Sequence, residues 1–489
     1  MMNNKTLSYR KHGKHALAVL LLAGSATGAL AQEATETAPM PMPMQATAQP
    51  GQPISMKDAI AVAMQSNPEI EQAQMNKEAI QFERKQAQGQ YLPRVDVEAS
   101  GGIRRLENRT RRTLGIADQE LYPVEGRASG TLDLIDFGKR RGELLRQASR
   151  VDGASLRVLE RSEFIALQTS RQYLNVLLQQ RIYAASQDNS AFHRTLVADL
   201  GTGVKEGSIS IADQQQAQER LQAAIVRETE AQQSLEDAKI TLRRLTGLDI
   251  DQYQVPPSLA AQMPGSVDEA VGLARTQNPL VKEAEADVDA ANALARSVKG
   301  ELYPTIGVDM TGRYGDDIDG FRGKTKDVTA RAFVKWNIYS GGITQAKYEE
   351  HVRRASEARF RLDQTSRGAE EDVRIAWNAL NAQTRISTEL ETQSKVSDDL
   401  LLSYRSQFNV GRRSLLDVLD AQNSRYSVQT RLETARFSQL FAQYQTLAAT
   451  NRFLTALEVA PGVGAGEKER ERFNYGPPKV SERQYRSRP

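Results

Sequence analysis

The chain has 489 residues, 39% of them apolar, with no cysteine, four histidines and a formal net charge of +3. This apolar content lies below the roughly 45 to 50% of globular chains and excludes a polytopic helical membrane protein. The absence of cysteine excludes disulfide scaffolds, thiolate zinc sites and cysteine nucleophiles. Two histidines fall in the first fifteen residues, and His193 and His351 lie far apart. We therefore expect no metal site and no cofactor.

The N-terminus has the features of a secretory signal peptide. Four basic residues precede an apolar run over 16–23, and an Ala-Leu-Ala cleavage site ends at Ala31. The run is shorter than the roughly 20 residues of a membrane-spanning helix. Removing residues 1–31 lowers the formal net charge from +3 to −1, so the charge gives no reason to expect a nucleic-acid partner. With Gln32 in first place, a lipoprotein acylated on a first cysteine is also excluded.

Prolines indicate the organisation of the mature chain. Residues 32–54 are rich in proline and methionine and predict an extended linker. The stretches 124–255 and 305–460 contain no proline, as long helices require. A second linker is expected over 248–265. The charged residues 460–489, rich in glycine and proline, predict a flexible tail.

An internal repeat organises the chain between these segments. The matching positions are Asn67, Pro68 and Pro93 with Asn278, Pro279 and Pro304 at an offset of 211, then Gly138, Gly207 and Asp213 with Gly342, Gly411 and Asp417 at 204. The halves 55–247 and 266–459 are therefore predicted to be two copies of one structural unit. The offset decreases from 211 to 204 between Pro93 and Gly138, so one copy has a longer loop in this region than the other.

Each copy contains two segments with strict alternation of apolar and polar residues. In the first, Val95 and Val97 alternate with Asp96 and Glu98. The same pattern begins again at Val124, Ile306 and Val328. A period of two over about ten residues predicts a strand with one apolar and one polar face. We expect four amphipathic strands, joined in pairs by loops over 106–121 and 314–327.

A helix of unusual length follows each predicted hairpin. Residues 139–200 would span about 90 Å as a helix. The apolar positions Leu167, Leu174, Leu178, Ala185, Phe192 and Leu196 step by sevens and fours, as in the seam of a coiled coil. The glycines of 201–207 are expected to end this helix, and a second helix, 208–246, to run back beside it. The other copy predicts helices over 343–407 and 414–458.

Together the two periods restrict the function. Four amphipathic strands fit a bilayer-spanning β-structure but cannot close alone, so several chains must share one barrel. The long helices have charged exteriors and must project from the membrane. No nucleophile, base and oxyanion hole come together, so we expect no enzyme. The alternative is a periplasmic coiled-coil adaptor or structural protein without a channel of its own, which would show one helical hairpin beside a β-rich module.

The late segment Phe408–Gln422, together with the early Asn-Pro pairs and the duplication, resembles the TolC family of outer-membrane efflux and secretion channels. The resemblance covers residues 55–458. It implies a mainly α fold with a small β part, in which three chains form a twelve-strand barrel in the outer membrane of a Gram-negative bacterium. This barrel would continue into a periplasmic α-helical barrel.

The resemblance also implies how such a channel works. It would be the exit duct of a tripartite system for type I protein secretion or multidrug efflux. Its partners would be outer-membrane lipid, a periplasmic membrane-fusion adaptor, and an inner-membrane ABC exporter or proton-driven pump. The adaptor would dock at the hairpin tips, marked by Gly207 and Gly411. The other interpretation of these glycines is a turn that needs positive φ.

The family's gate residues map onto the tips. The resemblance implies that Arg413 pairs with Asp213 to close the tunnel. The family's gate tyrosine is Phe408 here, and the threonine before the gate aspartate is Ala212. Both departures remove hydroxyl hydrogen bonds, so the ion pair would carry more of the closed state. The alternative is an ordinary surface pair worth less than about 1 kcal/mol.

An acidic ring is the last feature that the resemblance implies. Asp417 and Asp420 lie three residues apart and hence on one helix face. In a trimer they would bring six carboxylates around one axis, where they would attract cations. Alone, the same spacing is typical of a solvated helix face.

Overall fold

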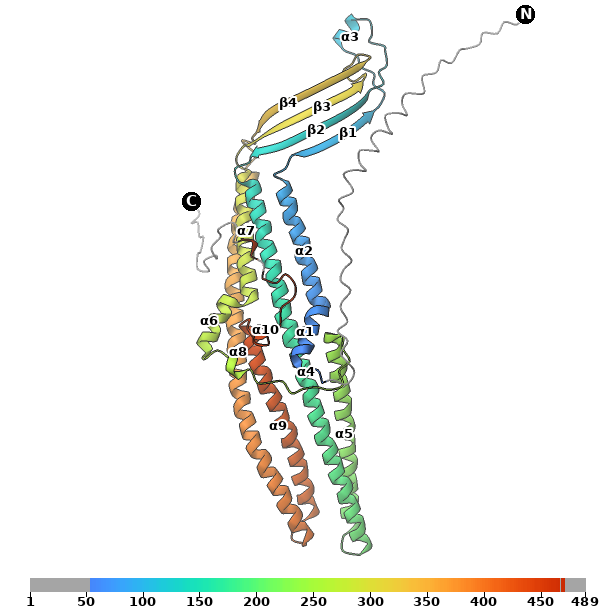
Figure 1. Cartoon of the computed structure of the whole chain (residues 1–489), viewed down its shortest axis with the longest axis vertical. Coiled ribbons are helices and arrows are strands. Elements are labelled where there is room, and N and C mark those ends of the chain that lie inside the picture. The colour runs from blue at the N-terminus through green and yellow to red at the C-terminus, as the bar shows by residue number, and fades with distance from the viewer. Residues whose placement is uncertain (1–52, 467, 471–489) are drawn as a thin grey trace, which may run out of the picture. The chain divides into compact units, whose positions relative to one another are not determined.

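The computed structural model describes residues 53–466 and 468–470, all within one compact unit. The predicted signal peptide, residues 32–52 of the first linker and residues 471–489 lie outside the described residues. The described chain is mainly helical with one four-stranded antiparallel sheet (Figure 1). This confirms the predicted fold class.

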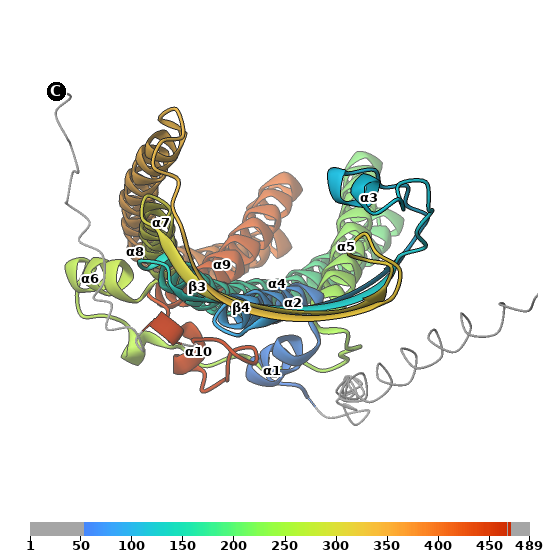
Figure 2. The same cartoon turned by 90° about the horizontal axis from the view of Figure 1, so that it is seen from above.

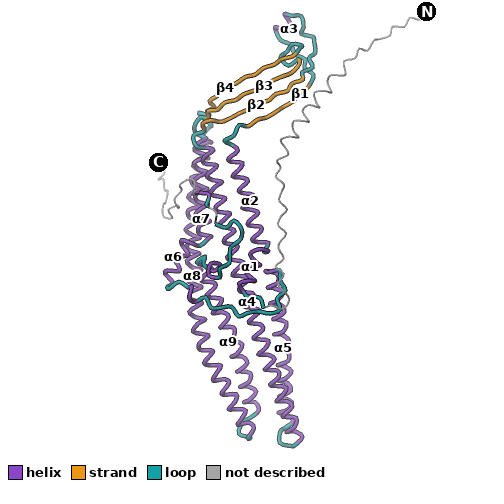
Figure 3. Tube along the Cα trace, viewed as in Figure 1, coloured by secondary structure: helices purple, strands orange, loops and turns teal. Residues whose placement is uncertain are grey.

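The element order repeats along the chain. Figure 3 shows that the strands of both copies lie together at one end of the long helices. The first copy contains α1 (Met56–Ser66), α2 (Pro68–Gly89), β1 (Arg94–Gly101), α3 (Arg109–Thr113), β2 (Val124–Ile135), α4 (Lys139–Lys205) and α5 (Ile211–Thr246). The second contains α6 (Val267–Gln277), α7 (Pro279–Gly300), β3 (Thr305–Asp316), β4 (Lys324–Lys335), α8 (Ile343–Asn409) and α9 (Leu415–Ala449). The short helix α10 (Phe453–Ala456) follows, and a 3-10 turn (Ala260–Gln262) lies between the copies.

The two Asn-Pro pairs begin equivalent helices. Asn67 is the N-cap of α2, where its side chain accepts a hydrogen bond from the Glu69 amide, and the following proline occupies the first helical turn. Asn278 caps α7 in the same way. Each asparagine also donates a side-chain hydrogen bond across the fold, to the Leu245 carbonyl and the Ala449 carbonyl respectively. The repeated motif therefore begins one helix and ties it to the end of another.

Two helix ends differ from the sequence expectation. The helix expected to stop at residue 200 continues to Lys205 through Gly201 and Gly203. A helical glycine costs only about 1 kcal/mol, which packing in a long helix outweighs. The last long helix, expected to reach residue 458, ends at Ala449, and Asn451 adopts a positive φ of 57° in the turn that precedes α10.

The sheet has the strand order β1-β2-β3-β4, and Figure 2 shows it as a curved layer. The loop between β3 and β4 covers only 317–323, shorter than expected, and the longer loop between β1 and β2 contains α3. Arg111 in α3 is buried and donates to the Gly320 carbonyl at 2.6 Å and to the Gln119 carbonyl at 2.7 Å. This side chain joins the two loops.

Helix α4 is the centre of the packing. It contacts α1, α2, α5, α7, α9 and α10. Between residues 140 and 177 it is buried on most sides. A coiled-coil seam, with one buried stripe, therefore describes only the part of α4 that follows residue 177. The largest apolar cluster gathers Ile60, Tyr173, Tyr444 and Phe453 from four helices. The Tyr173 hydroxyl also donates to the Ile54 carbonyl at 2.7 Å, which fixes the chain before α1.

The C-terminal segment, described for 461–466 and 468–470, packs against the helices. The Gly462 amide donates to the Ser162 hydroxyl at 2.9 Å. The Arg470 guanidinium bridges the buried carboxylates of Asp152 on α4 and Asp289 on α7, at 2.8 Å from each. Burial raises the pKa of both aspartates, and the arginine opposes this rise. The described part of this segment is thus held against α4 and α7, and the flexible tail over 460–489 stays a prediction.

Among the helices of the described residues, none combines the length and the apolar character needed to cross a membrane.

Candidate functional site

The two hairpin tips are built alike. Gly207 and Gly411 both adopt positive φ, at 72° and 74°, and each follows one long helix just before the next begins. Ser210 is the N-cap of α5 and accepts a hydrogen bond from the Asp213 amide. Ser414 caps α9 through the Asp417 amide in the same way. The matching aspartates of the two copies are thus accounted for by helix capping, before any role in a gate.

Arg413 lies at the second tip, and its side chain contacts residues of the same hairpin. Its Nε donates to the Gln407 Oε1 at 3.2 Å, its guanidinium lies 4.2 Å from the centre of the Tyr404 ring, and Asp417 is 3.7 Å away. Within the described part of this single chain, Arg413 pairs with Asp417 and not with Asp213. The predicted Arg413–Asp213 pair is not formed within the described residues of this chain and stays a prediction.

Phe408 links the apolar cores of the two hairpins. It packs against a cluster that contains Leu200 and Leu415, and against a second cluster that contains Leu401 and Val418. Ala212, at the position of the family's threonine, is exposed. An aromatic ring without a hydroxyl is therefore used here for packing between α4, α8 and α9.

The two aspartates of the expected ring differ in their surroundings. Asp417 is half-buried and accepts hydrogen bonds from the Ser414 amide and hydroxyl at 3.3 and 2.8 Å, forming a capping box. Asp420 is exposed, and among the described residues its carboxylate forms no hydrogen bond or ion pair. The Asp417 carboxylate already accepts hydrogen bonds, which reduces its capacity to attract a cation in an acidic ring. The Asp420 carboxylate is not engaged by the described residues and can attract one.

Sequence reasoning missed a buried polar contact between the hairpins. Gln422 on α9 donates to the Asn189 Oδ1 on α4 at 2.9 Å, and both side chains are buried. His193, one turn after Asn189, is also buried, and neither its Nδ1 nor the Gln422 Oε1 has a partner. Burial lowers the pKa of His193, and the positive charge of Arg227 lowers it further. The histidine is therefore neutral near pH 7.

The sheet separates apolar from charged residues as the alternation predicts. One face carries the ladder Val97, Ala128, Gly312 and Val328 across the four strands, and the other carries Glu98, Arg127, Arg313 and Asp327. Val97 is 81% exposed and Val328 70% exposed, so the apolar face is uncovered in the single chain. On the polar face, Arg313 lies 3.2 Å from Asp327. Such an apolar face suits lipid, and such a polar face suits a wet interior.

Exposed aromatic side chains gather where the strands meet the helices. They are Tyr91, Phe137, Tyr303, Trp336 and Tyr339. The Phe137 and Tyr303 rings stack at 5.4 Å, and the Trp336 indole donates to the Leu302 carbonyl at 3.2 Å. Aromatic rings with this exposure are typical of a membrane border. The sequence analysis missed this border, although aromatic residues just outside the predicted strands were a signal that could have found it.

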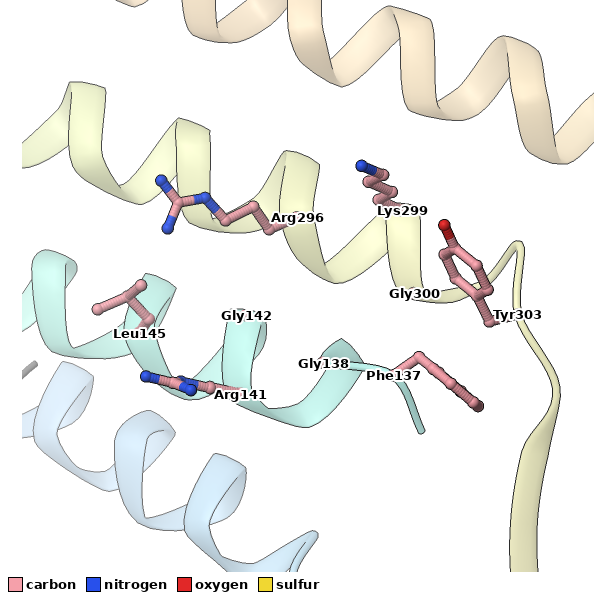
Figure 4. Close-up of a pocket in the computed structure, with 9 residues that line it drawn as sticks. All are labelled: Phe137, Gly138, Arg141, Gly142, Leu145, Arg296, Lys299, Gly300 and Tyr303. Carbon is pink, nitrogen blue, oxygen red and sulfur yellow. The ribbon is translucent and has the colours of Figure 1, made fainter. Parts of the chain in front are cut away.

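A cavity of about 710 Å³ lies between α4 and α7 beside these rings (Figure 4). The helices approach closely because two positions lack a side chain. A Cβ at Gly142 would lie 2.6 Å from the Ser297 amide nitrogen, and one at Gly300 would lie 2.9 Å from the Lys139 nitrogen. Arg141 and Lys299 line the cavity. Within the described ranges, no cluster of three or more histidine, aspartate or glutamate side chains could hold a metal ion.

The paired long helices, the small sheet with one lipid-facing side and the aromatic border define an outer-membrane channel protein. A family profile for outer membrane efflux proteins matches residues 59–248 and 270–452. The chain belongs to this family, which confirms the resemblance to TolC channels. It is therefore an export channel protein of the Gram-negative outer membrane, with its long helices in the periplasm. A coiled-coil adaptor without a channel of its own does not fit this family.

Individual proteins show the same relationship. The chain is 27% identical over 282 residues to the outer membrane efflux protein BepC of Brucella suis, a match covering 57% of this chain and 61% of BepC. It is 23% identical to the outer membrane protein TolC of Escherichia coli K12, over 78% of this chain and 79% of TolC. The crystal structure of the Campylobacter jejuni CmeC channel superposes with a TM-score of 0.74 at 14% identity, over 86% of this chain and 88% of CmeC.

Proposed function

We propose that three copies of this chain form the exit duct of a tripartite export system. The observation that carries the proposal is the open sheet. Strands β1 and β4 each pair on one side only, and the apolar face across all four strands is uncovered. Unpaired backbone groups are too costly in lipid, so the edges must find partners. Pairing β1 of one chain with β4 of the next closes a twelve-strand barrel.

The helices extend this barrel into the periplasm. Hairpins α4–α5 and α8–α9 would line a tunnel whose tips, at Gly207 and Gly411, meet a membrane-fusion adaptor. An inner-membrane ABC exporter or proton-driven pump would supply the energy. The duct itself carries out no reaction, so its chemistry is confined to opening, closing and charge selection.

The gate proposal follows from the surroundings of Arg413. Its side chain is held by neutral contacts with Tyr404 and Gln407 and by a loose 3.7 Å approach to Asp417. Such a cation can exchange partners at little cost. We propose that in the closed trimer it reaches an Asp213 supplied by a neighbouring protomer, while Asp420 contributes to an acidic ring.

Assembly can be tested cleanly because the chain contains no native cysteine. Cysteines would be introduced at Val95, Val97 or Ala99 in β1, each combined with Ala330→Cys in β4. Oxidation in outer membranes should then give covalent dimers and trimers for the pair that lies in register. A pair in β1 and at Met310 in the interior strand β3 is the matched control and should give none. A monodisperse monomer in detergent, with no crosslinking for any pair, would contradict the shared barrel.

A further inference from the structure

The cavity between α4 and α7 has the composition of an anion site. Its charged lining residues are Arg141, Arg296 and Lys299, and no carboxylate lines it. Figure 4 shows Arg141 on α4, at the edge next to α2, and Arg296 and Lys299 on α7, with Lys299 extending away from α4. Among the described residues, neither Arg141 nor Lys299 forms an ion pair. Two nearby carboxylates are already neutralised, since Asp136 binds Arg140 at 2.7 Å and Asp289 binds Arg470 at 2.8 Å. The cavity therefore carries a net positive charge.

The same cavity borders the membrane. The stacked pair Phe137 and Tyr303 closes one end, and both rings are about half exposed, at 51% and 46%. Beyond them begins the apolar face of the sheet, with Ile306 on β3 three residues after Tyr303. A ligand held by the cations could thus continue past the aromatic rings onto an apolar surface. This combination suits an amphiphile with a charged head.

The cavity opens on the outer side of the wall. On α4, Leu145 follows Arg141 by four residues and Asp152 follows Leu145 by seven. On α7, Arg296 follows Asp289 by seven. Each set therefore lies on one helix face. Arg470 of the C-terminal segment lies on that face, bound to both aspartates. A duct must keep its interior free for export. The face of α4 and α7 that the C-terminal segment covers is therefore the outer face of the tunnel.

We propose that this cavity binds the phosphate headgroup of an anionic phospholipid from the periplasmic leaflet of the outer membrane. The guanidinium of Arg141 donates charge-assisted hydrogen bonds to the phosphate oxygens, and the ammonium of Lys299 adds positive charge from the α7 side of the cavity. The rings of Phe137 and Tyr303 lie at the glycerol level, and the acyl chains follow the apolar sheet face. A cavity of about 710 Å³ is within the usual range for a bound small molecule.

The test uses the full chain in detergent, titrated with phosphatidylglycerol, phosphatidylcholine or inorganic phosphate. Thermal unfolding should shift upward by several degrees with phosphatidylglycerol alone. In the variant Arg141→Ala/Lys299→Ala, half-saturation should need at least ten times more of this lipid, since each of the two cations near an anionic lipid contributes about fivefold. Native mass spectrometry should show the lipid retained by the wild-type protein and lost by the variant.

Matched controls make the result specific. The exposed pair Arg385→Ala/Lys395→Ala removes the same charges from α8 and should bind like wild type. If the alanine variant does not assemble, Arg141→Gln/Lys299→Gln removes only the charges and carries the test. Equal lipid affinity in wild type and charge-free variant would overturn the site. An equal shift with inorganic phosphate would show a free-anion site and overturn its assignment to lipid.

Discussion

Glu163 on α4 offers the sharpest test of the packing around the C-terminal helix. The side chain is buried, its Oε1 accepts a long hydrogen bond of 3.4 Å from the Leu454 amide of α10, and its Oε2 has no partner. Burial raises the pKa of this carboxyl from 4.5 to about 8. At pH 7 the folded protein therefore holds a proton there that the unfolded chain does not.

The protein should lose stability as the pH rises. The free energy of unfolding is highest below pH 4.5 and falls as the pH rises toward 8, because folding must then take up a proton at Glu163. From pH 4.5 to 7 the cost is about 3 kcal/mol, since one pKa unit corresponds to about 1.4 kcal/mol. Glu163→Gln stays neutral at every pH. We expect it to remove this decline and to raise stability at pH 7 by up to about 3 kcal/mol, less the cost of one extra unpaired amide hydrogen.

The assay is the unfolding temperature of the detergent-solubilised protein, followed by the fluorescence of Trp336 and Trp377 between pH 5 and 8.5. The difference between Glu163→Gln and wild type should be small at pH 5 and largest near pH 8. Glu219→Gln, at an exposed position on α5, is the matched control and should follow wild type. A constant difference between Glu163→Gln and wild type at all pH values would refute the reasoning, because it would show that the carboxyl does not change protonation on unfolding.

Three further outcomes are expected. Arg470→Ala leaves two buried carboxylates without their cation and should destabilise the fold by about 3 to 5 kcal/mol, measured by thermal unfolding and limited proteolysis; replacing both carboxylates by amides should restore most of the loss. Arg413→Ser and Asp213→Asn should each raise single-channel conductance in planar bilayers, the asparagine being chosen because it can still cap α5; unchanged conductance in both would reduce the pair to a surface contact. Asp420→Ala should weaken cation selectivity more than Asp417→Ala does, as measured by reversal potentials under a salt gradient, and the effect should shrink at high salt.

The duplication and the sheet could be predicted because they depend on local period. Alternation placed Val95 and Val97 on one face and Asp96 and Glu98 on the other, and the strand register agrees, since Val97 pairs with Ala128 and Glu98 with Arg127. The end of α4 could not be predicted in this way. Residues such as Gly203 have weak helix preference alone, and only packing against the neighbouring turn decides that the helix continues.

The candidate site likewise has features that the sequence predicts and features that only the packing of distant segments determines. The tip positions of Gly207 and Gly411 follow from sequence, because a turn between two long helices needs positive φ. The contacts of Arg413 with Tyr404 and Gln407 depend on helix phase at the tip and were not expected. The cavity beside Phe137 has no sequence motif at all, since its walls come from α4 and α7, more than 150 residues apart in the chain.

The bridge from Arg470 to Asp152 and Asp289 has a consequence for the order of assembly. The two aspartates belong to different copies of the repeat, and the cation that neutralises both follows them in the chain by 318 and 181 residues. A chain emerging N-terminus first thus exposes an unfinished α4–α7 seam until its final portion arrives. The segment that carries Arg470 completes this seam, so α4 and α7 are held together fully only in copies that extend through residue 470. Truncation just before residue 470 should therefore be far more damaging than truncation just after it.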